Sequence, residues 1–208
     1  MTSQEKPMGK AAGPSDEELV EEFQRGDPYA FDVLVGRWDR KIQGAIYRIM
    51  GPEEDARDLC QETLLKAYRA LGTFKKEARF SSWLYQIALN VCRDRLRRRK
   101  ARPQVSLDEL MDAGEIAPAG RGPSPLELIE ARDLSRTVAA AVESLPPEQR
   151  EVIVLKEYQG LTFLEIAQAL DVPISTVKTR LYRGLGQLRQ RLERQGIHAA
   201  NPLPALTP

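Results

Sequence analysis

Histidine and cysteine are nearly absent from this chain. Its 208 residues include one histidine, His198, and two cysteines, Cys60 and Cys92. So few thiol and imidazole groups provide no disulfide framework, no recognisable metal-ligand set and no histidine-activated nucleophile. Both cysteines fall inside helical patterns, so we expect them to be small buried side chains; the alternative interpretation is a redox sensor.

Several other signatures are missing as well. The sequence contains no glycine-rich phosphate loop, HExxH motif or nucleophile elbow. It has no signal peptide and no apolar run long enough to cross a bilayer, so we expect a cytoplasmic protein without membrane insertion. No period-two run or hairpin dipeptide predicts a strand. We therefore predict an all-α protein that is not an enzyme and takes no cofactor, metal or small-molecule substrate.

Charge is plentiful but unevenly distributed. The formal net charge is only +1, although 29% of the residues are charged. Residues 93–102 are dense in Arg and Lys, whereas residues 53–62 and 108–133 are acidic. The total does not indicate a general nucleic-acid coat, but it hides a strong segregation of charge along the chain.

Helical periodicity occupies two blocks separated by a stretch of different composition. Residues 103–132 are rich in Pro, Gly, Ala and acids and have no sustained period, which is typical of a flexible acidic linker. Both ends of the chain are polar or rich in proline. Ser15 and Glu18 form a capping box that predicts the start of the first helix. The sequence predicts two small helical domains with these boundaries: a disordered start at 1–14, a first domain at 15–102, the linker at 103–132, a second domain at 133–195 and a disordered tail at 196–208.

The first block contains an acidic helix over about 54–71. Cys60, Leu64, Ala67 and Leu71 fall on its apolar stripe. A second face of the same helix presents three acids and an amide, which are Asp55, Asp58, Gln61 and Glu62. Acids on a helix are most often simply solvated, so spacing alone favours that interpretation over a partner site.

The next helix, capped by Ser81 or Ser82 and reaching about Lys100, ends in the basic run. One face presents five polar side chains at helical spacing: Gln86, Asn90, Arg93, Asp94 and Arg97. Asn and Gln match the donors and acceptors of base edges, and Arg binds phosphate or guanine, so this face predicts nucleic-acid contacts. A localisation-type basic tract is the alternative. A short basic loop with one aromatic residue, at 73–79, precedes this helix.

The second block ends in a helix-turn-helix pattern over residues 162–191. Thr162 and Glu165 form a capping box, the turn falls before Pro173, and Ser175 is expected to cap the second helix. The exposed face of that helix offers groove and phosphate contacts from Thr176, Lys178, Thr179, Arg180 and Arg183. An ordinary αα-hairpin with a solvated basic face is the alternative.

These pieces together resemble an extracytoplasmic-function (group IV) sigma factor of bacterial RNA polymerase. The resemblance covers nearly everything from Asp16 to Arg194. It rests on three stretches in order: DARDLCQETLLKAYRALGTF, RFSSWLYQIALNVCRDRLRRRKAR and LPPEQREVIVLKEYQGLTFLEIAQALDVPISTVKTRLYRGLGQL. A helix-turn-helix alone would be weak evidence, because many regulators have one. The competing interpretation is a stand-alone helix-turn-helix regulator that binds DNA without polymerase.

The resemblance implies a role for each face. The acidic face Asp55, Asp58, Gln61 and Glu62 resembles region 2.2, which docks on the β′ clamp of core polymerase. The loop and basic helix resemble regions 2.3 and 2.4, which open the −10 element, through Phe74, Lys75, Lys76, Gln86, Asn90, Arg93, Asp94 and Arg97. The C-terminal part resembles region 4, which binds the β flap and recognises the −35 element, through Ser175, Thr176, Lys178, Thr179, Arg180, Tyr182 and Arg183. The family also implies an anti-sigma partner and a stress or envelope-response regulon.

Overall fold

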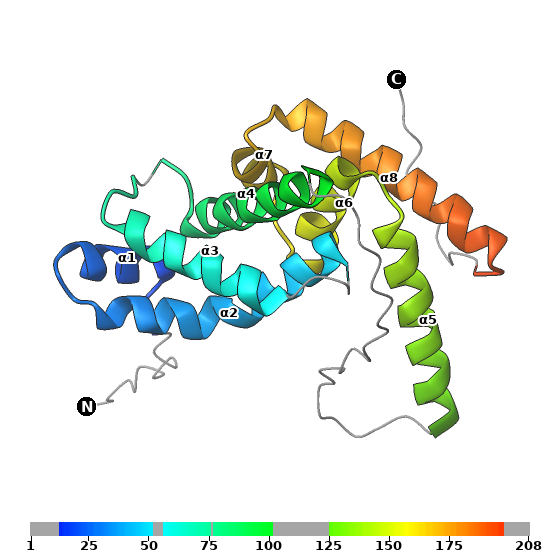
Figure 1. The fold of residues 1–208 in the computed structure, drawn as a ribbon, viewed down its shortest axis with the longest axis horizontal. Helices are drawn as coiled ribbons and strands as arrows, with labels where there is room; N and C mark the ends of the chain where they lie inside the picture. Colours follow the sequence, from blue (N-terminus) through cyan, green and yellow to red (C-terminus); the bar gives the residue numbers. More distant parts are fainter. Residues whose placement is uncertain (1–12, 52–55, 76, 102–124, 198–208) are drawn as a thin grey trace, which may run out of the picture.

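The computed structural model describes residues 13–51, 56–75, 77–101 and 125–197. Every regular element within these ranges is helical, and no strand occurs there, which confirms the all-α prediction. The elements are α1 (Asp16–Gln24), α2 (Tyr29–Met50), α3 (Ala56–Leu71), α4 (Phe80–Ala101), α5 (Pro125–Glu143), α6 (Pro147–Ile153), the π-helical turn η1 (Val154–Tyr158), α7 (Phe163–Leu170) and α8 (Ile174–Arg194) (Figure 1).

The predicted segments at 1–14, 103–132 and 196–208 lie mainly outside the described residues, as does His198. None of the helices in the described ranges is both long enough and apolar enough to cross a membrane.

Helices α1 to α4 form the N-terminal half. Ser15 begins α1 with the predicted capping box, in which its hydroxyl accepts from the Glu18 amide at 3.2 Å. Asp16 then fixes α1 to α2, because its carboxylate accepts from Arg37 Nη1 at 2.9 Å and from Trp38 Nε1 at 3.0 Å. A neutral donor and a charged donor therefore satisfy one carboxylate at the junction of the two helices.

The core of this half lies between α2, α3 and α4. Trp38 of α2 stands edge-on to Phe80 and Tyr85 of α4, with ring centroids 6.0 and 5.8 Å apart. Leucine and isoleucine side chains at spacings of three and four surround these rings, and burial of each contributes roughly 1.5–3 kcal/mol. The fully buried members include Leu34, Ile42, Ile46, Leu71, Leu84 and Leu89.

The C-terminal half consists of α5 to α8. Thr162 begins α7 with the second predicted capping box, in which its hydroxyl accepts from the Glu165 amide at 3.2 Å. The turn after α7 depends on Asp171, whose φ of 55° lies in the left-handed region and closes the helix end. Ala167 is buried at this turn, as expected for two helices that cross closely.

Four helix boundaries differ from the sequence predictions. Helix α4 begins at Phe80, so Ser81 and Ser82 lie inside it instead of capping it. Helix α8 begins at Ile174 after Pro173, whose extended backbone starts the helix without a side-chain cap, so the prediction that Ser175 caps it is wrong. Proline at or next to the first turn supplies a fixed φ and needs no amide hydrogen there.

The other two differences concern α5 and η1. Helix α5 begins at Pro125, so residues 125–132 of the predicted linker are helical. A proline at the first helical position, followed by Leu and Glu residues with high helix propensity, accounts for this start. The π-helical turn at Val154–Tyr158 was not predicted, since hydrophobic spacing does not distinguish it from an α-helix.

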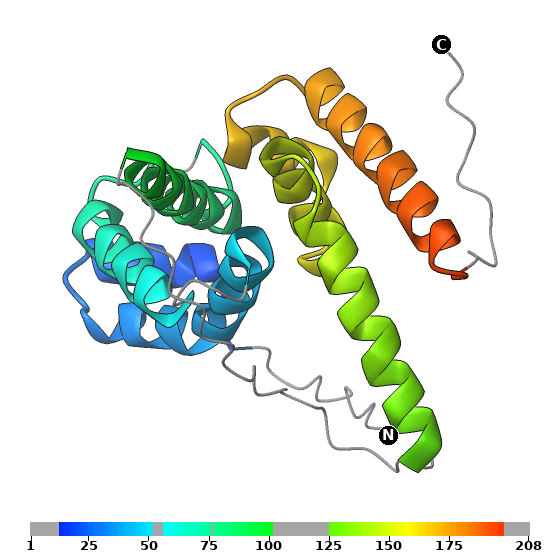
Figure 2. The same cartoon turned by 45° about the vertical axis from the view of Figure 1, so that its right-hand side comes forward.

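The two halves are in direct contact. Helix α4 packs on α7, and α2 packs on α5 and η1 (Figure 1). Buried side chains of both halves form one continuous core cluster. The beginning of α5 extends away from the rest of the molecule (Figure 2). The sequence predicted two domains but gave no sign that they would pack on each other.

Candidate nucleic-acid interface

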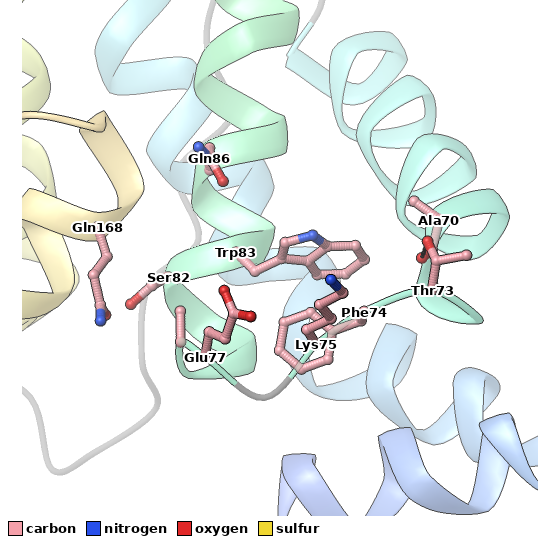
Figure 3. Close-up of a pocket in the computed structure, with 10 residues that line it drawn as sticks. Ala70, Thr73, Phe74, Lys75, Glu77, Ser82, Trp83, Gln86 and Gln168 are labelled. Carbon is pink, nitrogen blue, oxygen red and sulfur yellow. Dashed lines mark hydrogen bonds between the residues drawn. The ribbon is translucent and has the colours of Figure 1, made fainter.

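A cavity of about 260 Å³ lies beside the loop that joins α3 to α4. Gln24 shapes this loop from α1, because its amide nitrogen donates to the carbonyl oxygens of Leu71 at 3.1 Å and Phe74 at 2.9 Å. Figure 3 shows the lining residues, which come from three segments of the chain: Ala70, Thr73, Phe74, Lys75, Glu77, Ala78, Ser82, Trp83, Gln86 and Gln168.

The cavity combines an aromatic surface with polar groups. Phe74 is buried, and its ring centroid lies 5.0 Å from that of Trp83. Trp83 is half-buried and lies beside Lys75 in Figure 3, with Gln168 on the opposite side of the cavity. Phe74 lines the cavity and its ring also packs against that of Trp83, so its predicted contact with DNA stays a prediction. Trp83 also lines the cavity, although it was not among the predicted site residues.

Ser82 adds an unsatisfied polar atom to this cavity. Its side chain is 1% exposed, and its hydroxyl oxygen has no hydrogen-bond partner within the described part of the chain. A buried hydroxyl without a partner costs about 1–3 kcal/mol, so a hydrogen bond from a bound molecule to the Ser82 hydroxyl would be favourable. The cavity can therefore accept a planar molecule that has hydrogen-bonding groups at its edge.

The polar face of α4 continues from the cavity. Gln86 is half-buried at its edge, and Asn90 is exposed one turn further on. Arg93 is engaged inside the protein: its Nε and Nη2 donate to both carboxylate oxygens of Glu151, at 3.0 and 2.6 Å. The hydrogen bond to Glu151 raises the pKa of Arg93 despite partial burial. On this face of α4, Asn90 and Arg97 have the most exposed side chains.

Asp94 and Arg97 form a local pair on the same helix, as their spacing of three residues allows. The hydrogen bond from Arg97, together with its charge, lowers the pKa of Asp94. Arg97 is well exposed beyond this contact. Asp94 thus orients the Arg97 guanidinium along the basic end of α4.

The acidic face of α3 is exposed as predicted. Asp58 and Gln61 are exposed, and Glu62 pairs with Lys66 at 2.8 Å. Asp55 and Lys76, the two remaining predicted residues of the N-terminal half, lie outside the described residues. The structure adds Leu65, whose side chain is 49% exposed one turn after Gln61. The available signal was the position of Leu65, an apolar residue four positions after Gln61 and three after Glu62, on the same helix face as the acids.

The second helix of the helix-turn-helix, α8, separates an apolar side from a polar side. Val177, Leu181, Gly184 and Leu188 are buried. Ser175, Lys178, Thr179 and Arg183 are exposed, and Thr176 is half-buried. The Thr179 hydroxyl donates to the Ser175 carbonyl at 2.9 Å, which leaves its methyl group and oxygen lone pairs on the surface. This polar side can enter a groove of duplex DNA.

Two of the predicted α8 residues are more enclosed than the others. Arg180 Nη2 pairs with Glu148 of α6 at 3.0 Å, and the Arg180 side chain is 22% exposed. Tyr182 is half-buried. In this structure Arg180 holds α8 against the start of α6, and its contact with DNA stays a prediction.

The comparisons with known proteins agree on one family. Two family models match this chain, Sigma-70 region 2 over residues 34–102 and Sigma-70 region 4 over residues 135–188. The RNA polymerase sigma-H factor of Pseudomonas aeruginosa is 35% identical over 182 residues, which are 86% of this chain and 94% of that protein. The chain belongs to the sigma-70 family, as an extracytoplasmic-function sigma factor. A member of this family binds core RNA polymerase and directs it to promoters.

A second relative and two solved structures are also similar to this sigma factor. The ECF RNA polymerase sigma-E factor of Escherichia coli K12 is 36% identical over 172 residues, 81% of this chain and 90% of the relative. The structure of CnrH in complex with the cytosolic domain of CnrY matches with a TM-score of 0.63 at 28% identity, covering 86% of this chain and 97% of CnrH. The sigma factor RpoE in complex with the anti-sigma factor NepR from Bartonella quintana matches in fold, with a TM-score of 0.62 at 24% identity over 78% of this chain and 96% of that one.

Proposed function

We propose that this sigma factor binds core polymerase and the two promoter elements through three separate surfaces. The exposed side of α3 binds core polymerase, the cavity with α4 binds the −10 element, and α8 binds the −35 element. The observation that supports this most is the cavity at residues 73–86, with its aromatic wall and its unsatisfied Ser82 hydroxyl, directly beside the polar face of α4. A groove-binding helix on the same chain supplies the second DNA contact.

The cavity holds one unpaired base of the −10 element. Trp83 offers a flat face for stacking, which contributes ~1–3 kcal/mol per base. Lys75 neutralises the adjoining phosphate, and the Ser82 hydroxyl and Gln86 amide hydrogen-bond the edge of the base. Phe74 supports Trp83, and Lys76 extends the basic loop.

The face of α4 steadies the strand next to that base. Gln86 and Asn90 approach base edges, while Arg93 and Arg97 bind phosphates. Asp94 acts on DNA only through Arg97, which it orients. The basic end of α4 therefore contributes an oriented guanidinium as well as positive charge.

Helix α8 recognises the −35 element in the major groove. Ser175, Thr176, Thr179 and Arg183 are placed for base edges, and Lys178 for a phosphate. Arg180 and Tyr182 position the helix and reach the groove rim.

The core-binding surface consists of Asp58, Gln61 and Glu62 around the exposed Leu65, and we also assign Asp55 to it from the sequence. Such an arrangement, an apolar side chain within a polar rim, is common at the centre of protein interfaces. It docks on the β′ clamp, and the C-terminal half docks on the β flap. The function is one of binding, without a catalytic step, and it takes place in the cytoplasm beside the chromosome.

An anti-sigma factor and a stress or envelope-response regulon complete the proposal. The neighbour of known structure with 28% identity, CnrH, is described in complex with CnrY. A partner of this kind would hold the present chain inactive until a signal arrives.

The decisive experiment is run-off transcription with core polymerase, this chain and a panel of candidate promoters. We expect promoter-dependent initiation, and we expect the paired substitution Asp58→Arg with Glu62→Arg to abolish it by preventing core binding. Asp32→Arg, an exposed acid on α2, is the matched control and should behave as the unmodified chain. A folded sample that initiates at none of the promoters would contradict the proposal.

The alternative, a stand-alone helix-turn-helix regulator, makes the opposite prediction for DNA alone. The free chain would then bind a duplex site tightly in a gel-shift assay without polymerase. We expect weak duplex binding by the free chain and tight binding by the complex with core, since neither half alone makes many phosphate contacts.

A further inference from the structure

Two adjacent residues of α6 connect the C-terminal half to the N-terminal half. Arg150 Nη1 donates to the carbonyl oxygen of Ile49 at 2.8 Å, at the end of α2. The neighbouring Glu151 is 4% exposed and receives the two hydrogen bonds from Arg93 of α4. One turn of α6 thus forms hydrogen bonds with both α2 and α4 of the N-terminal half.

Arg150 also belongs to its own half. Its Nη2 donates to the carbonyl oxygens of Leu145, at 3.2 Å, and of Glu143, both at the end of α5. A single guanidinium therefore satisfies helix-end carbonyls of α2 and α5 together, and these groups would otherwise lack partners. The junction between the halves is specific and hydrogen-bonded.

Three further polar contacts cross the same junction. The Tyr85 hydroxyl donates to Gln159 Oε1 at 2.7 Å, and Arg79 pairs with Glu165 at 3.2 Å. The Arg48 guanidinium lies over the Tyr158 ring, 4.5 Å from its centroid.

This arrangement conflicts with simultaneous binding of two promoter elements. Helices in contact lie roughly 8–10 Å apart. Helix α4 is in contact with α7, and α7 is in contact with α8, so α4 and the start of α8 lie within roughly 20 Å of each other. DNA sites one to two helical turns apart are separated by roughly 35–70 Å. The halves must therefore separate before α4 and α8 can occupy both elements.

Among these contacts, the pair of Arg93 and Glu151 has a chemistry that relates it to DNA binding. A guanidinium binds a carboxylate and a phosphate with the same two-pronged geometry. Glu151 therefore occupies the position on Arg93 that a DNA phosphate would take. We infer that Glu151 is an internal substitute for the promoter backbone, and that it latches the free sigma factor in a closed form with reduced affinity for −10 DNA.

The closure part of this inference stands on the contacts alone, whereas the DNA part rests on the proposed function of α4. When most molecules are closed, the apparent affinity for DNA equals the affinity of the open form multiplied by the fraction of molecules that are open. Loss of the latch should raise affinity by about 5- to 150-fold, the usual range for coupled sites.

The test compares Glu151→Gln and Glu151→Ala with the matched control Glu148→Gln. Glu148 lies on the same helix and pairs with Arg180 inside its own half. Its charge acts on Arg93 without a hydrogen bond, so its substitution removes a similar charge and leaves the two hydrogen bonds between Arg93 and Glu151 in place. Fluorescence energy transfer between dyes at Tyr29→Cys and Gln190→Cys reports the separation of the halves. Binding of a labelled single-stranded −10 oligonucleotide to the full-length free chain reports affinity, and circular dichroism reports folding.

We expect lower transfer and at least about fivefold tighter oligonucleotide binding for both Glu151 variants, and neither change for Glu148→Gln. The paired exchange Arg93→Glu with Glu151→Arg should restore high transfer, because it rebuilds the ion pair in reverse. Identical transfer for the unmodified chain and folded Glu151 variants would overturn the inference. Lower transfer without tighter binding would support the latch and contradict the assignment of α4 to DNA, so the two proposals fail separately.

Discussion

The end of the Ile153 side chain lies where a side chain at Gly184 would have to be. A β-carbon at Gly184 would come within 2.7 Å of Ile153 Cδ1 and 3.3 Å of Gln149 Cβ. Helices α6 and α8 meet at this point without space for a methyl group. The close packing of α8 on α6 therefore requires a glycine at position 184.

Gly184→Ala should therefore lower the free energy of unfolding, because overpacking usually costs about 1–3 kcal/mol and the higher helix propensity of alanine offsets only roughly 0.5–1 kcal/mol of it. Urea unfolding followed by circular dichroism measures this loss. Adding Ile153→Val, which removes Cδ1, should recover part of it. Gly186→Ala is the matched control, because nothing lies within 4 Å of its added β-carbon; it should gain roughly 0.5–1 kcal/mol from helix propensity. Equal stability of the two alanine variants would contradict this packing.

Trp83→Leu should weaken binding of a single-stranded −10 oligonucleotide by the polymerase complex. Leucine keeps the apolar contact with Phe74 but removes the flat face, so we expect a loss of ~1–3 kcal/mol, roughly 5- to 150-fold. Fluorescence anisotropy titration measures the affinity. Tyr29→Leu, an aromatic residue that is 75% exposed elsewhere, should leave it unchanged. Unaltered binding by folded Trp83→Leu would exclude stacking in the cavity.

Arg183→Ala should alter binding of the complex to −35 duplexes in a sequence-dependent way, at about 1–3 kcal/mol for the base it contacts. Lys178→Ala should instead weaken all duplexes similarly and reduce the salt slope of the logarithm of affinity by about one. Titrations at several salt concentrations separate the two effects. Gln190→Ala, exposed further along α8, serves as the control. Indistinguishable profiles for the two variants would contradict their assigned roles.

The Cys60 thiol should be inert to alkylation in the folded protein near neutral pH. Burial, then the charge and hydrogen bonding of Asp39, raises its pKa from 9.0 to about 12. Because the folded pKa is the higher one, the associated stability is present below pH 9 and is lost as pH rises toward 12. Mass spectrometry of iodoacetamide-treated protein at pH 8 should find Cys60 modified only after unfolding. Rapid labelling of the native chain would favour the redox-sensor interpretation.

The sequence predicted those features that depend on nearby residues. The capping boxes of Ser15 and Thr162 were identified because each needs only two side chains three residues apart. The exposed faces of α3 and α8 followed from helical spacing. Asp55 and Lys76 lie outside the described residues, so their placement stays a prediction.

Features that join distant residues could not be predicted in the same way. Nothing near Arg93 in the chain indicates Glu151, and nothing near Tyr85 indicates Gln159. Arg180 has the same chemistry as Arg183, and only the position of α6 makes one a partner of Glu148 and leaves the other exposed. The Ser82 hydroxyl was predicted to cap α4, but the helix begins at Phe80 and Ser82 lies inside it.

Gln168 has a consequence for the timing of transcription initiation. It belongs to α7, yet it forms a wall of the cavity whose other lining residues lie between Ala70 and Gln86. In the open form that we infer, Gln168 has moved away with α7, so the proposed base pocket changes shape on opening. We therefore expect the C-terminal half to move toward the −35 element first. Binding of a −10 base in the cavity should follow that movement.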